Sequence, residues 1–127
     1  MRRAERSLNS EELKDLIIDA LDDAKGVGIV ALDVTELTDV TDYMVIVTGT
    51  SNRHVRSMTD RVIEACRERG ERPLGVEGEE AGEWVLLDMT DVVVHVMLAA
   101  ARELYDLERL WSDLGRVTSD ESETATT

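Results

Sequence analysis

The stretch Trp84-Val85-Leu86-Leu87-Asp88-Met89-Thr90-Asp91-Val92-Val93-Val94-His95-Val96-Met97 decides the fold, because it reads as two strands joined by a tight turn. A two-residue turn at Met89 and Thr90 predicts an antiparallel hairpin. In that register Trp84 lies opposite His95, and Asp88 lies opposite Asp91. The register depends on the turn, since the positive φ of a type I′ turn suits a β-branched residue such as Thr90 poorly.

The predicted hairpin has two unlike faces. One is wholly aliphatic and suits packing against helices; its residues are Val85, Leu87, Val92, Val94 and Val96. The other mixes large apolar and polar groups, which a sealed core rarely does, and is the candidate partner-binding surface. It carries Trp84, Leu86, Asp88, Asp91, Val93, His95 and Met97.

Two features of the mixed face bear on whether it binds a partner. Tryptophan is strongly enriched among interface hot spots, but an ordinary cross-strand pair of Trp84 and His95, half covered by a loop, explains the pattern equally well. The predicted pairing of Asp88 with Asp91 places like charges opposite each other, which is destabilising. A basic partner would relieve that repulsion.

Amphipathic helices are predicted before, between and after the strands. Apolar residues at helical spacing predict a helix from about Ser10 to Lys25, and Asn9 and Glu12 at its start are spaced as a capping box. The same spacing predicts a second helix over residues 51–69 and a third over 99–110. The third helix would place Leu104, Leu107 and Trp111 on one apolar stripe.

Three further strands are predicted outside the hairpin. The apolar runs 29–34 and 42–48 predict largely buried strands, and residues 72–78, which hold the single proline Pro73, predict an edge strand or an extended loop. Alternating helices and strands in 127 residues predict one α/β domain over residues 10–114. Residues 1–9 are predicted to be flexible, and the acidic Ser/Thr-rich residues 115–127 a disordered tail.

The composition narrows the class of function. A net charge of −14 argues against non-specific nucleic-acid binding, although general solubility or a salty or alkaline habitat explains the same charge. No apolar run is long enough to span a membrane, and no signal-peptide core follows the N-terminus. We therefore expect a soluble cytoplasmic protein.

The sequence contains no arrangement of residues that indicates catalysis. The turn Thr48-Gly49-Thr50-Ser51 precedes a predicted helix and could hold a phosphate, but it lacks the P-loop lysine, so Ser51 is expected to cap that helix. An acid-x-acid pair that holds magnesium in nucleotidyltransferases lies on a strand, whereas the triplets here fall in a predicted loop (77–79), a predicted helix (106–108) and the predicted tail (121–123). His54 is expected to be exposed, and Cys66 to be a buried hydrophobe. We predict no catalytic, cofactor or metal residue; a nucleotide-binding enzyme is the alternative hypothesis.

Four motifs carry a resemblance to a known family. They are residues 41–55 (TDYMVIVTGTSNRHV), residues 75–78 (GVEG), the hairpin 84–97, and Tyr105 with residues 107–111 (LERLW). In order and spacing they closely resemble the RsfS/Iojap family, over roughly residues 13–112. One departure is Thr90, where the family usually has glycine.

The resemblance implies a fold and a function. The fold is a mixed β-sheet of about five strands flanked by amphipathic helices, related to nucleotidyltransferases but without their catalytic acids. The function is binding to the large ribosomal subunit through ribosomal protein L-fourteen, which blocks small-subunit joining and lowers translation when nutrients are short. A large-subunit assembly factor would share this docking surface. Homologues also suggest a homodimer in isolation.

The resemblance also carries over to individual positions. Trp84 falls on the family's strand tryptophan, and Asp88, Asp91 and His95 fall on its Asp and His positions. A matching Arg-His pair is present as Arg53 and His54. Trp84 is therefore expected to be central to the ribosomal contact.

Overall fold

The computed structural model describes residues 8–112. The predictions for residues 1–7 and for the tail 115–127 lie outside the described residues. In chain order the elements are α1 (Ser10–Asp23), β1 (Val27–Asp33), β2 (Tyr43–Gly49), α2 (Asn52–Arg67), β3 (Gly75–Glu77), β4 (Trp84–Asp88), β5 (Val92–Leu98) and α3 (Ala99–Tyr105).

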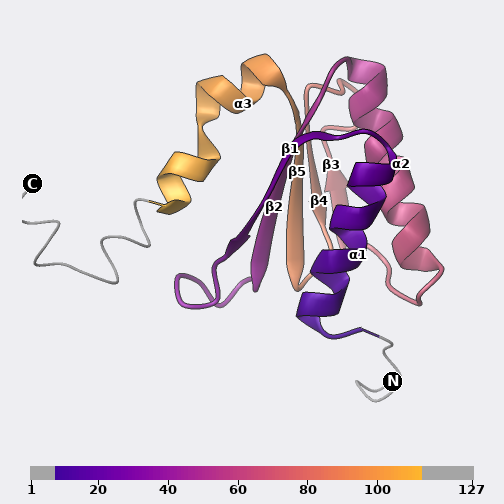
Figure 1. The fold of residues 1–127 in the computed structure, drawn as a ribbon, viewed down its shortest axis with the longest axis vertical. Helices are drawn as coiled ribbons and strands as arrows, with labels where there is room; N and C mark the ends of the chain where they lie inside the picture. The colour runs from indigo at the N-terminus through magenta and orange to yellow at the C-terminus, as the bar shows by residue number, and fades with distance from the viewer. Residues whose placement is uncertain (1–7, 113–127) are drawn as a thin grey trace, which may run out of the picture.

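The five strands form one mixed sheet in the order β1-β2-β5-β4-β3. The central strands β2 and β5 are parallel, whereas the outer pairs β1–β2, β4–β5 and β3–β4 are antiparallel. Helices α1 and α2 lie side by side against one face of the sheet, and α3 lies on the other side (Figure 1). The predicted mixed α/β fold is confirmed.

Both long helices begin at the caps that the sequence predicts. The Asn9 side chain accepts a hydrogen bond from the backbone N–H of Glu12 at 2.8 Å, and the Glu12 carboxylate accepts one from the Asn9 N–H at 3.0 Å. This reciprocal pair satisfies two N–H groups that a helix start leaves without partners. At α2, Ser51 Oγ accepts from the His54 N–H. Leu8, which the sequence placed in the flexible N-terminus, is buried in the core.

Two apolar clusters lie on opposite faces of the sheet. The larger one lies between the sheet and the helices α1 and α2, and it contains all five residues of the predicted aliphatic hairpin face: Val85, Leu87, Val92, Val94 and Val96. The smaller one consists of Val34, Met44, Ile46 and Met97 on the other face. Leu107 and Trp111 pack partly against it. The aliphatic face is therefore confirmed as the main core.

Strand β1 is less buried than predicted. The apolar run 29–34 was expected to be a largely buried strand, but no residue of β1 is buried. The reason is position: β1 is an edge strand that pairs with β2 alone. By contrast, β2 is buried over Met44–Val47, as predicted.

The last helix is broken. A single helix over residues 99–110 was predicted, but α3 ends at Tyr105, Asp106 adopts a left-handed conformation with φ of 48°, and residues 107–112 are helical again. The break turns the chain, so the predicted stripe does not form. Leu107 and Trp111 pack on the smaller cluster, whereas Leu104 is 75% exposed.

No helix within residues 8–112 is both long enough and apolar enough to cross a lipid bilayer.

Candidate functional site

The candidate surface is the mixed face of β4 and β5, on the side of the sheet away from α1 and α2. Along β4, Val85 and Leu87 are buried, while the residues that alternate with them, Trp84, Leu86 and Asp88, are half-buried. Period-2 alternation produces this difference, since successive side chains of a strand point to opposite faces. The three half-buried side chains form one side of the candidate site.

The pairing of β4 with β5 differs from the prediction by two residues. Trp84 lies opposite Met97, Leu86 opposite His95, and Asp88 opposite Val93. The predicted two-residue turn at Met89 and Thr90 is wrong. A shift of two residues leaves every side chain on its predicted face, because the side-chain period of a strand is two.

The connection between the strands explains the shift. Thr90 has φ of 75°, and the Asp91 N–H donates to the Met89 carbonyl across it at 2.9 Å. The Asp88 carboxylate accepts a hydrogen bond from the Thr90 N–H at 2.8 Å. Asp88 therefore does not lie opposite Asp91, and the predicted like-charge pair, with the basic partner inferred from it, does not stand.

The seven predicted surface residues differ in accessibility. Five are half-buried: Trp84, Leu86, Asp88, Asp91 and Val93. His95 is 5% exposed and Met97 is fully buried in the smaller cluster. A partner could touch the half-buried residues directly, whereas His95 and Met97 lie beneath them.

Trp84 lies between two other rings. Its indole N–H donates to Nδ1 of His95 at 3.0 Å, and the centroids of these two rings are 5.9 Å apart. The Tyr105 ring of α3 lies 4.6 Å from the indole, measured between centroids. The prediction did not include Tyr105 in the site. On the predicted helix over residues 99–110, Tyr105 does not fall on the apolar stripe of Leu104, Leu107 and Trp111, so helical spacing does not place it against the sheet.

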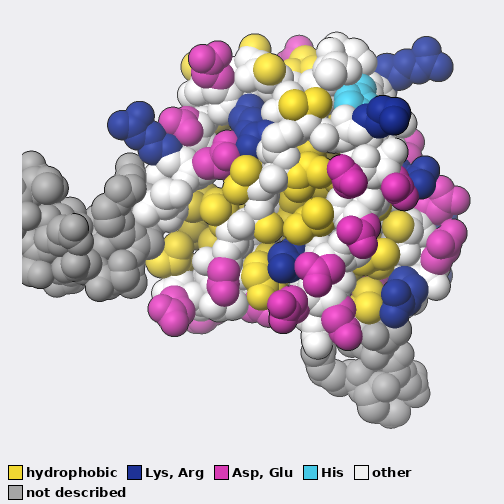
Figure 2. All heavy atoms as spheres, viewed as in Figure 1, with side chains coloured by type: hydrophobic (Ala, Val, Ile, Leu, Met, Phe, Trp, Pro, Cys, Tyr) yellow, Lys and Arg dark blue, Asp and Glu magenta, His cyan; other side chains and the backbone are white. Residues whose placement is uncertain are grey.

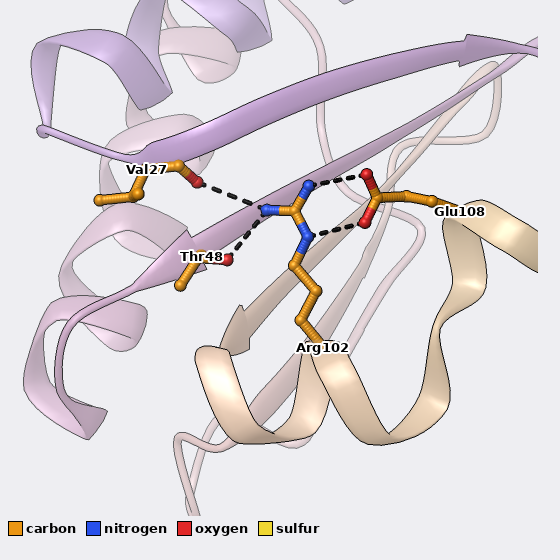
Figure 3. A network of polar contacts seen from close by, with 4 residues as sticks. All are labelled: Val27, Thr48, Arg102 and Glu108. Carbon is orange, nitrogen blue, oxygen red and sulfur yellow. Dashed lines mark hydrogen bonds and ion pairs between the residues drawn. The ribbon is translucent and has the colours of Figure 1, made fainter.

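Helix α3 is held in place by Arg102 (Figure 3). The guanidinium donates to both carboxylate oxygens of Glu108, at 2.8 and 2.9 Å, and to the Thr48 hydroxyl at 2.9 Å. It also donates to the Val27 carbonyl at 3.5 Å. The hydrogen bonds from Arg102 lower the pKa of the Glu108 carboxyl. Arg102 thus joins α3, the segment after the helix break, β1 and β2, and it supports the position of Tyr105.

The turn before α2, which by its sequence could hold a phosphate, has a hydrogen-bond partner within the chain. The Thr50 N–H donates to Nδ1 of His54 at 2.9 Å. Nδ1 is therefore unprotonated, so the proton is on Nε2, which lies 2.8 Å from the Ala24 carbonyl. The expectation of an exposed His54 is wrong: the ring is half-buried and bridges the end of α1 to the start of α2.

The remaining candidate groups are a cysteine and the metal-ligating side chains. Cys66 is buried as predicted, and burial raises the pKa of its thiol to about 11. Within the described part of the chain, no three His, Cys, Asp or Glu side chains lie close enough to hold a metal ion. The triplet 121–123 lies outside the described residues.

A family model described as ribosomal silencing factor during starvation matches residues 7–127. The chain belongs to the RsfS family. The ribosomal silencing factor RsfS of Chromobacterium violaceum is 48% identical over 101 residues, which are 80% of this chain and 83% of that protein. The RsfS protein of Haemophilus influenzae is 40% identical over 100 residues, which are 79% of this chain and 98% of that protein.

The similarity extends beyond bacterial RsfS proteins and into solved structures. A mouse protein named for mitochondrial assembly of the ribosomal large subunit is 32% identical over 101 residues, 77% of this chain and 44% of the mouse protein. A crystal structure of a Chromobacterium violaceum protein superimposes with a TM-score of 0.81 at 46% identity, covering 83% of this chain and 88% of that one. A crystal structure of a Bacillus halodurans protein superimposes with a TM-score of 0.73 at 36% identity, covering 80% of this chain and 94% of that one. The RsfS family and its fold are thus established for this chain.

Proposed function

We propose that this chain binds the large ribosomal subunit in the cytoplasm and prevents the small subunit from joining it, so that translation falls when nutrients are short. The docking target in this proposal is ribosomal protein L-fourteen at the intersubunit face. Support comes from membership of the RsfS family and from the names of its relatives, which are ribosomal silencing factors and a large-subunit assembly protein.

The observation that supports the proposed docking surface is a half-buried apolar group, which consists of Trp84, Leu86 and Val93. These residues lie on the sheet face opposite α1 and α2, part of which α3 and residues 107–112 cover. Asp88, which pairs with Val93, and Glu77, which pairs with Leu86, add acidic groups to this face. An apolar centre with a polar rim is typical of protein interfaces.

The overall charge supports a basic partner in a limited way. Ribosomal proteins are mostly basic, and complementary charge speeds encounter and fixes orientation. However, acidic side chains are spread over the whole face seen in Figure 2 and do not gather in one patch. The net charge of −14 therefore favours association with a basic protein without selecting a docking surface.

Co-sedimentation with purified large subunits tests the surface. Val93→Asp places a carboxylate in the apolar group, and Val27→Asp makes the same change on the edge strand β1, where Val27 is 49% exposed. In the sheet order, β2 and β5 separate β1 from β4. We expect Val93→Asp to abolish co-sedimentation and Val27→Asp to retain it, with circular dichroism confirming that both variants fold. Equal binding by both would contradict the surface.

Two further measurements test the mechanism. Light scattering on mixing the two subunits should show slower and less complete joining in the presence of the chain. A role in large-subunit assembly, suggested by the name of the mouse relative, would use the same surface earlier; it predicts recovery of the tagged chain on precursor particles and not on mature large subunits.

The proposed role is non-enzymatic. Calorimetry with magnesium and nucleoside triphosphates should show no micromolar binding; clear binding would favour the nucleotide-binding alternative. We also propose that the free chain forms a homodimer, which sedimentation equilibrium tests directly.

A further inference from the structure

Trp84 is held by the chain itself on two sides. His95 lies under its indole N–H at 3.0 Å, and Tyr105 packs against the ring with centroids 4.6 Å apart. Trp84 is half-buried, whereas His95 is 5% exposed. The histidine is therefore more deeply buried than the tryptophan that it contacts.

The direction of this hydrogen bond determines the state of His95. An indole N–H can donate but cannot accept, so Nδ1 of His95 must present a lone pair. The imidazole proton is then on Nε2, and the ring is neutral. Burial supports the neutral form, because it lowers the pKa of His95 to about 4.

The bond also determines what Trp84 offers to a partner. The indole nitrogen is the one polar atom of the side chain, and it is committed within the chain. A partner at this face meets the carbon atoms of a ring whose orientation is already set. Rigid aromatic anchors of this kind lose little conformational entropy on binding.

We infer that His95 is a positioning residue: as a buried hydrogen-bond acceptor it holds the Trp84 ring in its binding orientation, and it does not itself contact the partner. This inference rests on the proposed docking of the same face on the large ribosomal subunit. It reassigns His95 from the contact residues that the sequence predicts to a supporting role. The strand register agrees, since Leu86, a half-buried member of the apolar group, is the residue opposite His95.

Two variants separate the acceptor from the ring. His95→Asn keeps a side-chain oxygen that can accept from the indole, whereas His95→Leu keeps bulk and removes the acceptor. Both are compared with the unmodified chain by titration against purified large subunits. The bond lies within the chain and is present with and without the partner, so its loss weakens binding through the cost of fixing a freed Trp84 ring. For His95→Leu we therefore expect about a fivefold weaker affinity. His95→Asn should bind nearly as the unmodified chain does.

Nuclear magnetic resonance reports the Trp84–His95 hydrogen bond and the protonation of His95 independently of binding. A scalar coupling between the Trp84 indole nitrogen and Nδ1 of His95 is expected across the N–H···N bond in ¹⁵N-labelled protein. Trp111→Phe leaves Trp84 as the single tryptophan and so assigns the indole signal. In His95→Leu the indole N–H should exchange faster with solvent, while backbone signals away from β4 and β5 stay in place.

The outcomes separate this inference from the proposed function. If the unmodified chain binds and folded His95→Leu binds with the same affinity, the positioning role is overturned and the proposed function stands. A proton on Nδ1 of His95 would have the same consequence. Weaker binding of both variants would show that the imidazole itself is needed, and would also overturn it. Failure of the unmodified chain to bind large subunits would overturn the proposed function, while the nitrogen–nitrogen coupling would still report the state of His95.

Discussion

Replacing His95 with asparagine should remove a specific part of the acid sensitivity of this protein. The pKa of His95 is about 4 in the folded chain, against an ordinary value of 6.5. Between these values the unfolded chain binds a proton that the folded chain does not, so acidification lowers the free energy of unfolding. This contribution is fully present above pH 6.5 and is lost as the pH falls toward 4. From pH 7 to pH 4.5 the expected loss at His95 is about 2 kcal/mol.

Urea unfolding followed by circular dichroism, at intervals from pH 7 to pH 4.5, measures this loss. Many carboxyl groups titrate near the lower end of the range, but they are common to the unmodified chain and to His95→Asn. The difference between the two proteins therefore isolates the histidine. We expect the stability advantage of the unmodified chain over the variant to shrink by about 2 kcal/mol on acidification. A difference that stays constant across the range would refute the neutral, buried His95.

Three further predictions concern the framework of the site. Gly78 and Gly70 both have positive φ, but a Cβ added at Gly78 would meet the backbone of β4, whereas a Cβ at Gly70 would meet no atom. In urea unfolding, Gly70→Ala should therefore lower the free energy of unfolding by about 1 kcal/mol, and Gly78→Ala should lower it by about 3 kcal/mol or more. Asn9→Ala should cost about 1 kcal/mol through loss of the capping box, and an unchanged midpoint would contradict that bond. Arg102→Gln should cost about 2 kcal/mol and speed hydrogen exchange in residues 107–112, while the exposed control Arg109→Gln should change neither.

The faces of the hairpin were predictable and its register was not. Alternation of side chains assigns each residue to a face, and that assignment survives any shift by an even number of residues. The register depends on the connection between the strands, where the Asp88 carboxylate accepts a hydrogen bond from the Thr90 N–H and Thr90 adopts a positive φ. Thr90 signals an unusual turn in the sequence, but not which turn replaces the expected one.

Helix starts were predictable because their signals are local. The capping box of Asn9 and Glu12 and the Ser51 cap each involve residues within three positions of one another. Similarly, the apolar stripe of α2 correctly placed Cys66 in the core.

The break after α3 had no comparable signal. The helical period runs through Asp106 without interruption, and the groups that hold the broken form are distant in sequence. Arg102 reaches Thr48 and Val27 as well as Glu108, so the bend is stabilised by contacts that exist only in the folded sheet. The contact of Tyr105 with Trp84 and the bridge from His54 to Ala24 also join residues that are distant in sequence, so local patterns did not predict them.

Electron cryomicroscopy of the chain bound to purified large subunits tests the central claim most directly. We predict that the chain binds ribosomal protein L-fourteen at the intersubunit face, with Trp84, Leu86 and Val93 at the contact and His95 behind them. A chain docked through α1 and α2, or bound at a position that leaves the small-subunit surface open, would contradict it.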